Sequence, residues 1–326
     1  MADQNPSANV NQQFPKKYFL LVLVFSSPFW LLGEVAHRFL PDSMPINLPI
    51  SSLMAVCPLL AAAVLKSREG GTSAVFQLLR RSLDFRRIKR ARWYIPTLLL
   101  MPAIMVIEYG ILRLLRTPLP DLQLPVLLLP VFTIMFFVAT LTEELGWQGY
   151  AFDRLPDKWS ALGASLFLGV VWAAWHIIPF IQAGRSPDWI IWQCLNLIVT
   201  RVVIIWLFLN TGKSVFAASL FHTMINVTAF LFPNFGSHYD PFITWILVTI
   251  VAATVTSLWG PKTLARLQWK HTDAPISGSA SQATRRDEQM SYGQFSAGVP
   301  RVEQGHVRPG FYDTDLESDG AKGKQL

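Results

Sequence analysis

The chain has 326 residues, of which 52% are hydrophobic and 15% are charged, and its mean hydropathy is +0.34. This balance excludes an ordinary water-soluble enzyme, because soluble domains contain about 25% charged residues. The formal charge of +7 is concentrated in a few short segments, which indicates membrane orientation and contact with anionic headgroups. The sequence shows no nucleic-acid-binding motif, so no nucleic-acid partner is expected.

Apolar segments that are long enough to cross a bilayer recur along most of the chain. A spanning helix needs roughly 20 mostly apolar residues, and this criterion predicts an all-α, multi-pass transmembrane helical bundle of about eight spans. Lys and Arg are concentrated in alternate connections, which predicts a cell-membrane protein with both termini cytoplasmic; Arg113, Arg116 and Arg185 do not fit this pattern. The predicted spans are 18–40, 49–65, 93–115, 126–153, 159–181, 189–209, 214–232 and 241–260.

The remaining segments complete the predicted domain organisation. Residues 1–17 are expected to be a cytoplasmic N-terminal segment, 18–260 the transmembrane domain and 261–326 a cytoplasmic tail. The tail should be mostly disordered, because after about residue 271 it lacks hydrophobic periodicity. The basic connection 66–92 has two interpretations: an amphipathic helix at the membrane interface, or a solvated loop that only sets topology.

Polar side chains inside the spans are the candidates for function. A charged group near the bilayer centre costs about 2.5–3.5 kcal/mol on insertion scales, so each one needs a structural or chemical reason. The candidates are Glu34, His37, Glu108, Glu143, Glu144, His176, Arg201, His222 and Asn226.

The fourth span contains two adjacent carboxylates, Glu143 and Glu144. Neighbouring side chains on a helix diverge by about 100°, so the two should have different roles. One, held in a medium of low dielectric, is suited to take a proton from water, and the other could brace neighbouring helices. Alternatively, the pair marks the cytoplasmic end of the span, although the apolar continuation through Phe152 argues against that interpretation.

His222 and Asn226 are four residues apart and therefore share one helix face. They could polarise a carbonyl oxygen, ligate a metal together with His176 and a glutamate, or serve only in helix packing. With a rise of 1.5 Å per residue, Glu143, His222 and Asn226 lie roughly 16, 12 and 18 Å from the inner ends of their helices. They therefore share one membrane depth, whereas His176, at roughly 25 Å, lies deeper.

Three short motifs in successive order resemble the CPBP intramembrane proteases, which include the type II CAAX prenyl proteases and bacteriocin-processing and abortive-infection relatives. The motifs run from Glu143-Glu144 to Gln148, from Trp172 to His176, and from His222 to Asn226, and the resemblance covers approximately residues 93–232. Gln148 stands where the family usually has Arg, and Trp172 stands in place of Phe. Glu144 then lacks its usual partner, and Arg201, at a similar depth in the sixth span, is the expected substitute.

The resemblance implies an intramembrane endopeptidase that acts on a membrane-associated protein or peptide, as in CAAX-box protein processing. It implies that Glu143, aided by His176, activates water, that His222 and Asn226 hold the carbonyl oxygen, and that Glu144 supports the site. A metalloendopeptidase with zinc on Glu143, His176 and His222 and a metal-free glutamate mechanism both remain open. Gln148 motivates an alternative function, a non-proteolytic membrane scaffold for immunity or regulation, and a small-solute transporter is a third.

Overall fold

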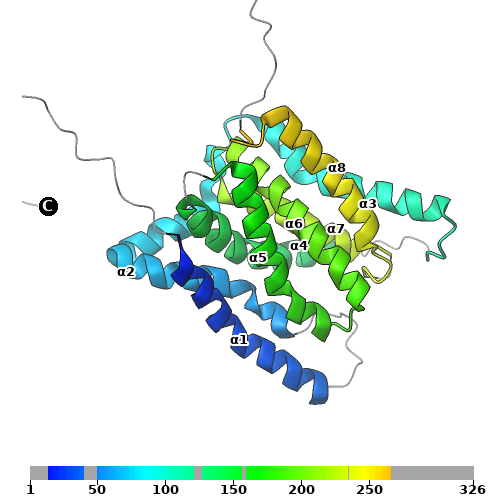
Figure 1. Cartoon of the computed structure of the whole chain (residues 1–326), viewed down its shortest axis with the longest axis horizontal. Coiled ribbons are helices and arrows are strands. Elements are labelled where there is room, and N and C mark those ends of the chain that lie inside the picture. Colours follow the sequence, from blue (N-terminus) through cyan, green and yellow to red (C-terminus); the bar gives the residue numbers. More distant parts are fainter. Residues whose placement is uncertain (1–13, 40–49, 121–126, 156–158, 234, 266–326) are drawn as a thin grey trace, which may run out of the picture. The chain divides into compact units, whose positions relative to one another are not determined.

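The computed structural model describes residues 14–39, 50–120, 127–155, 159–233 and 235–265 (Figure 1). The predicted all-α class is confirmed, because these residues form α-helices, short 3-10 or π turns, and no strand. The first 13 residues and residues 266–326, which make up most of the predicted tail 261–326, lie outside the described residues. The helices are α1 Lys16–Phe39, α2 Cys57–Arg80, α3 Tyr94–Leu114, α4 Leu129–Gly146, α5 Ala161–Gln182, α6 Pro187–Asn210, α7 Val215–Leu231 and α8 Pro241–Trp259.

Seven helical segments of the described chain are long and apolar enough to cross a membrane, which makes this a multi-pass membrane protein. The other predicted span, α7, has 17 residues and is a shorter apolar helix. It packs against α3, α4 and α6, and many of its side chains are buried. The α7 helix is therefore an inner helix of the bundle.

The second helix extends beyond the end that the sequence predicts at residue 65. It begins with a 3-10 turn, Ile50–Val56, and α2 then continues to Arg80 through a break at Gly70 and Gly71. Gly71 has φ 64°, a conformation that glycine adopts at low cost. A 3-10 helix, Arg81–Arg87, follows, so the first part of the basic connection is helical and the interpretation as a solvated loop is wrong.

The end of the fourth span is irregular. After Gly146 the chain forms a π-helical turn, Trp147–Ala151, and then a 3-10 turn, Phe152–Arg154. Gly146 permits close packing on α2, because a Cβ atom there would lie 2.5 Å from the backbone of Pro58. Single π turns inside helices are frequent at functional sites.

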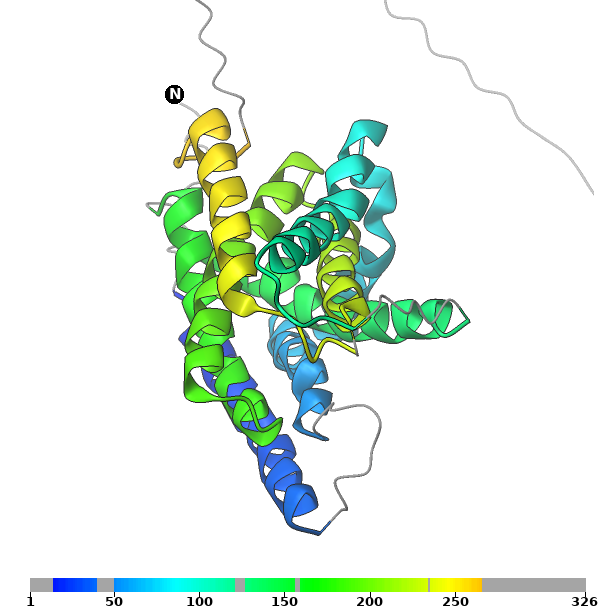
Figure 2. The same cartoon turned by 90° about the vertical axis from the view of Figure 1, so that its right-hand side faces the viewer.

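Contacts between neighbouring helices bring the candidate residues together. The α5 helix runs beside α6, and α6 runs beside α8 (Figures 1 and 2). Gly169 lets α5 approach α6 closely, because a Cβ atom there would lie 2.8 Å from the carbonyl oxygen of Ile198. Thr140 on α4 and Thr223 on α7 share a hydrogen bond of 2.9 Å. The residues one turn further along these helices form the site.

Candidate active site

The two adjacent glutamates on α4 point in different directions, as helix geometry predicts. Glu143 accepts a hydrogen bond of 2.9 Å from Nε1 of Trp172 and lines a pocket. Glu144 is fully buried and accepts bonds from Arg201 and from His222. Glu143 therefore has access to a ligand, whereas the carboxylate of Glu144 is occupied by protein partners.

Arg201 is the partner of Glu144 that the sequence predicts. Its Nη1 lies 2.8 and 2.9 Å from the two carboxylate oxygens of Glu144, and neither side chain is exposed. Gln148, in the position of the motif arginine, is also fully buried, but its amide forms no hydrogen bond within the described residues. The cation that faces Glu144 thus comes from α6 and not from the turn after α4.

Trp172 contacts Glu143, Arg201 and both histidines of the site. Its indole donates to Glu143, and its ring face lies under the guanidinium of Arg201, 4.0 Å from the ring centroid. The rings of His176 and His222 meet it edge to face at centroid distances of 5.2 and 5.1 Å. Sequence analysis treats Trp172 only as an aromatic replacement for Phe, yet its N–H supplies a contact to Glu143 that Phe lacks.

The hydrogen bonds of the two histidines fix which ring nitrogen has a hydrogen. Nδ1 of His176 lies 2.9 Å from the carbonyl oxygen of Trp172, and Nδ1 of His222 lies 3.0 Å from Oε1 of Glu144. A carbonyl or carboxylate oxygen only accepts, so both Nδ1 atoms must donate. In the neutral imidazole, Nε2 of His176 is therefore left as an acceptor.

The pocket beside Glu143 has a volume of about 260 Å³. Its walls are mainly apolar, from Met54, Phe136 and Phe180, and its polar lining includes His176, Asn226 and Arg185. The amide of Asn226 forms no hydrogen bond within the described residues and is partly exposed. His222 is 2% exposed and is not part of this lining, so it lies behind the pocket next to Trp172.

Arg185 is the residue that sequence analysis misses at this pocket. It appears there only as an exception to the charge pattern of the connections, but in the structure it lines the pocket and lies over the ring of Trp189 at 4.7 Å. Burial lowers the pKa of its guanidinium, and no acidic residue of the described chain pairs with it. An unpaired cation in an apolar pocket is a recognition element for a negatively charged ligand group.

The remaining polar candidates lie elsewhere. Glu108 accepts hydrogen bonds from the backbone N–H of Asp240 and from the hydroxyl of Thr244, so it joins α3 to the start of α8. Glu34 is exposed on α1, and the side chain of His37 lies outside the described residues. Neither Glu108 nor Glu34 lines the pocket at Glu143.

The predicted zinc ligands do not meet at one point within the described part of the chain. Structural and catalytic zinc sites bring three or four Cys, His, Asp or Glu side chains to one point. Within the described part of the chain, no three such side chains are placed to hold one ion. Glu143, His176 and His222 as arranged do not fit the zinc site, which stays a prediction from the sequence, and no step below depends on it.

The fold and the site together define a multi-pass membrane protein with a buried glutamate–histidine site. Residues 125–228 match the model of a family described as "Type II CAAX prenyl endopeptidase Rce1-like", and this range includes all five predicted site residues. The chain is 28% identical over 232 residues to "CAAX prenyl protease 2" of Methanococcus maripaludis, covering 65% of this chain and 83% of that protein. Both matches support the resemblance of this chain to the CPBP family of intramembrane proteases.

Proposed function

We propose that the protein is an intramembrane endopeptidase that hydrolyses a peptide bond of a membrane-associated protein or peptide. The observation that carries the proposal is the different surroundings of the two glutamates. Glu143 lines the pocket with His176 and Asn226, while Glu144 is held by Arg201 and His222. One carboxylate is therefore available for chemistry, and the other holds a histidine in place.

The first step is the activation of water. Oε2 of Glu143 accepts from Trp172, which leaves Oε1 to accept a hydrogen from a water molecule in the pocket. Nε2 of His176 accepts the second hydrogen, because its Nδ1 is committed to the Trp172 carbonyl. The water oxygen attacks the peptide carbonyl carbon while Glu143 takes one proton, which is general base catalysis.

The second step is the collapse of the tetrahedral intermediate. Asn226 donates its amide hydrogen to the carbonyl oxygen as negative charge develops, which is the role of an oxyanion-hole donor. His222, one helical turn away, lies behind the pocket and supports the site through its hydrogen bond to Glu144 and its ring contact with Trp172. Glu143 then gives its proton to the leaving nitrogen, the C–N bond breaks, and a carboxylic acid and an amine are released.

Arg185 points to the part of the substrate that this pocket recognises. Its unpaired guanidinium matches a carboxylate, which a peptide presents at its free C-terminus. The relative from Methanococcus maripaludis is named CAAX prenyl protease 2. For this chain we propose cleavage close to a free C-terminal carboxylate, in CAAX-type processing or a related reaction.

The alternative of a non-proteolytic scaffold rests on the replacement of the motif arginine by Gln148. The structure weakens this argument for a scaffold, because Arg201 supplies the cation that pairs with Glu144.

The test of the proposed function compares Glu143→Gln with Glu108→Gln, a buried intramembrane glutamate outside the pocket. Purified variants in micelles receive a farnesylated CAAX peptide and the same peptide without the prenyl group.

We expect Glu143→Gln to lose cleavage of both peptides and Glu108→Gln to keep it. The loss should be about 10²–10⁴-fold, the usual contribution of a general base. Cleavage by Glu143→Gln at the rate of the unmodified protein would contradict the proposal. If neither peptide is cleaved by the unmodified protein, while the variants still complement its loss in cells, the scaffold function would be favoured instead.

A further inference from the structure

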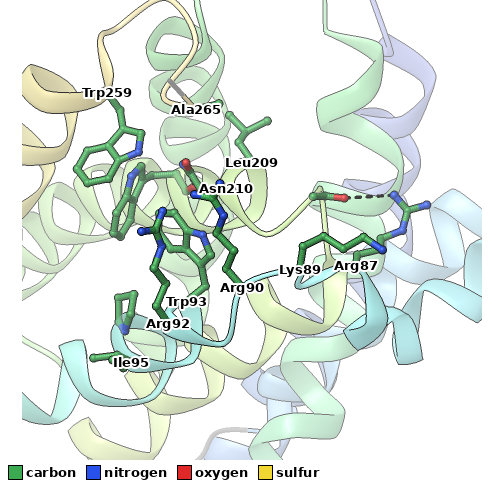
Figure 3. A pocket seen from close by; sticks show the side chains of 13 residues that line it. Arg87, Lys89, Arg90, Arg92, Trp93, Ile95, Leu209, Asn210, Trp259 and Ala265 are labelled. Atoms are coloured by element: carbon green, nitrogen blue, oxygen red, sulfur yellow. Dashed lines mark hydrogen bonds between the residues drawn. The ribbon is translucent and has the colours of Figure 1, made fainter. Parts of the chain in front are cut away.

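A second cavity, of about 810 Å³, lies where three apolar helices begin or end (Figure 3). Trp93 immediately precedes α3, Trp206 is in the last turns of α6, and Trp259 is the final residue of α8. Tryptophan is enriched at membrane–water interfaces, where its ring is apolar and its N–H is polar. The cavity therefore lies at the level of lipid headgroups, and it shares no lining residue with the pocket at Glu143.

The cavity has four cations in its lining: Arg87, Lys89, Arg90 and Arg92. Arg87 is partly occupied, because Nε lies 3.6 Å from Asp84 and Nη1 donates to the Gly212 carbonyl oxygen. Lys89, Arg90 and Arg92 are exposed and have no ion pair with an acid of the described chain. Three unpaired cations at one cavity match the charge of a polyanionic or phosphate-bearing ligand.

The opposite wall of the cavity is aromatic and has a free donor. The rings of Trp93 and Trp259 lie at 5.3 and 5.1 Å from that of Trp206. Trp206 is 6% exposed, and its buried Nε1–H has no partner within the described residues. Asn210 donates to the carbonyl oxygens of Trp206 and Leu264 and so holds the segment after α8 against the end of α6.

The outer edge of the cavity is apolar. Ile95, in the first turn of α3, lines it and is 62% exposed. Figure 3 shows Arg90, Arg92 and Trp93 gathered near Asn210, with Ile95 beside them. Cationic groups next to an exposed aliphatic side chain match a ligand with a charged head and a hydrocarbon tail. A soluble phosphate compound without a hydrocarbon chain would make no apolar contact with this edge.

We propose that this cavity binds the phosphate-bearing headgroup of an anionic lipid. Arg90 and Arg92 contact the phosphate, Trp206 donates its indole hydrogen, and the acyl chain leaves the cavity along Ile95. Basic cavities between transmembrane helices are a recurring form of headgroup recognition. The inference does not rest on the proposed function, because no residue of the site at Glu143 takes part.

The experiment measures the binding of phosphatidylglycerol to the full chain in detergent micelles by native mass spectrometry. The double variant Arg90→Gln/Arg92→Gln removes two cations of the cavity. The matched control, Arg68→Gln/Arg80→Gln, removes the same charge from exposed positions on α2 outside the cavity. We expect the cavity variant to bind about 30-fold more weakly, which corresponds to about 2 kcal/mol for two basic residues, and the control to bind normally.

A third variant, Trp206→Phe, keeps the aromatic wall and removes only the hydrogen-bond donor. We expect about 5-fold weaker binding, the effect of one lost hydrogen bond. Unchanged melting of each variant in lipid-free detergent shows that folding is intact. Equal losses in the cavity variant and its α2 control, or equal binding of phosphatidylcholine with the same acyl chains, would overturn the proposal. If glycerol phosphate at constant ionic strength displaced the bound phosphatidylglycerol completely, the ligand of the cavity would be a soluble phosphate compound and the proposal of a lipid would be wrong.

Discussion

Replacing Arg201 by Met tests the buried ion pair on which the site geometry depends. Nη1 of Arg201 contacts both oxygens of Glu144, and both side chains are inaccessible to solvent. Removing one partner of a buried pair costs about 3–5 kcal/mol, because the other charge stays buried. Nδ1 of His222 still donates to Glu144 in the variant, so we expect the free energy of unfolding to fall by about 3 kcal/mol, the lower end of this range. This loss is a large share of the 5–15 kcal/mol that is the typical free energy of unfolding of a folded domain.

The assay is unfolding of the purified protein in mixed micelles, with Glu144→Gln/Arg201→Met as the matched double variant. The double variant leaves no unpaired charge, so it should be more stable than Arg201→Met alone by at least about 1 kcal/mol. Arg201→Met should also lower the cleavage rate, because Glu144 orients His222 through the same carboxylate. An Arg201→Met protein as stable as the unmodified chain, or a double variant with no recovery, would refute the assigned pairing.

Three further predictions concern the pocket. Trp172→Phe removes the N–H that Glu143 accepts and keeps a ring under Arg201, so kcat should fall about 10-fold with KM nearly unchanged; an unaltered kcat would contradict the contact. Arg185→Gln should raise KM about 10-fold for a peptide with a free C-terminal carboxylate and leave an amidated peptide unaffected, and equal effects on both would exclude carboxylate recognition. Because Glu143, His176 and His222 do not form a three-ligand site, the active protein should contain less than about 0.1 metal ion per chain by elemental analysis and keep its rate after chelation; stoichiometric zinc that is lost together with activity would contradict this geometry.

Much of the fold follows from the length and polarity of the apolar segments. The predicted ends of most spans lie close to the observed helix ends, because loss of hydropathy and helix termination coincide there. The second span is the exception. Its helix passes through Gly70 and Gly71 into a basic segment whose polarity suggests an exit from the bilayer, but the Arg81 side chain holds this segment by donating to Gly149.

Helix arithmetic also predicts part of the site. The divergence of Glu143 and Glu144 follows from helix geometry, and the pairing of Arg201 with Glu144 follows from the family resemblance together with depth. The depth argument sets His176 apart, yet it lines the same pocket as Glu143. Rise along one helix gives no information on how helices tilt relative to one another.

The contacts of Trp172 and Arg185 could not be predicted from the sequence. The indole N–H of Trp172 on α5 reaches Glu143 on α4, and Gly169, one turn earlier on α5, lets this helix approach α6 closely. Arg185 lies in the short connection between α5 and α6, where local sequence does not determine the direction of a side chain. Both contacts depend on the packing of several helices, which a single sequence pattern does not specify.

The central claim is that Glu143 directs a water molecule onto a peptide bond. The most direct measurement is cleavage of a membrane-associated peptide in H₂¹⁸O, with the products analysed by mass spectrometry for the unmodified protein and for Glu143→Gln. The account predicts that one ¹⁸O atom enters the newly formed carboxylate and that the initial rate falls about 10²–10⁴-fold in the variant. Cleavage without ¹⁸O incorporation, or an unchanged rate in Glu143→Gln, would contradict it.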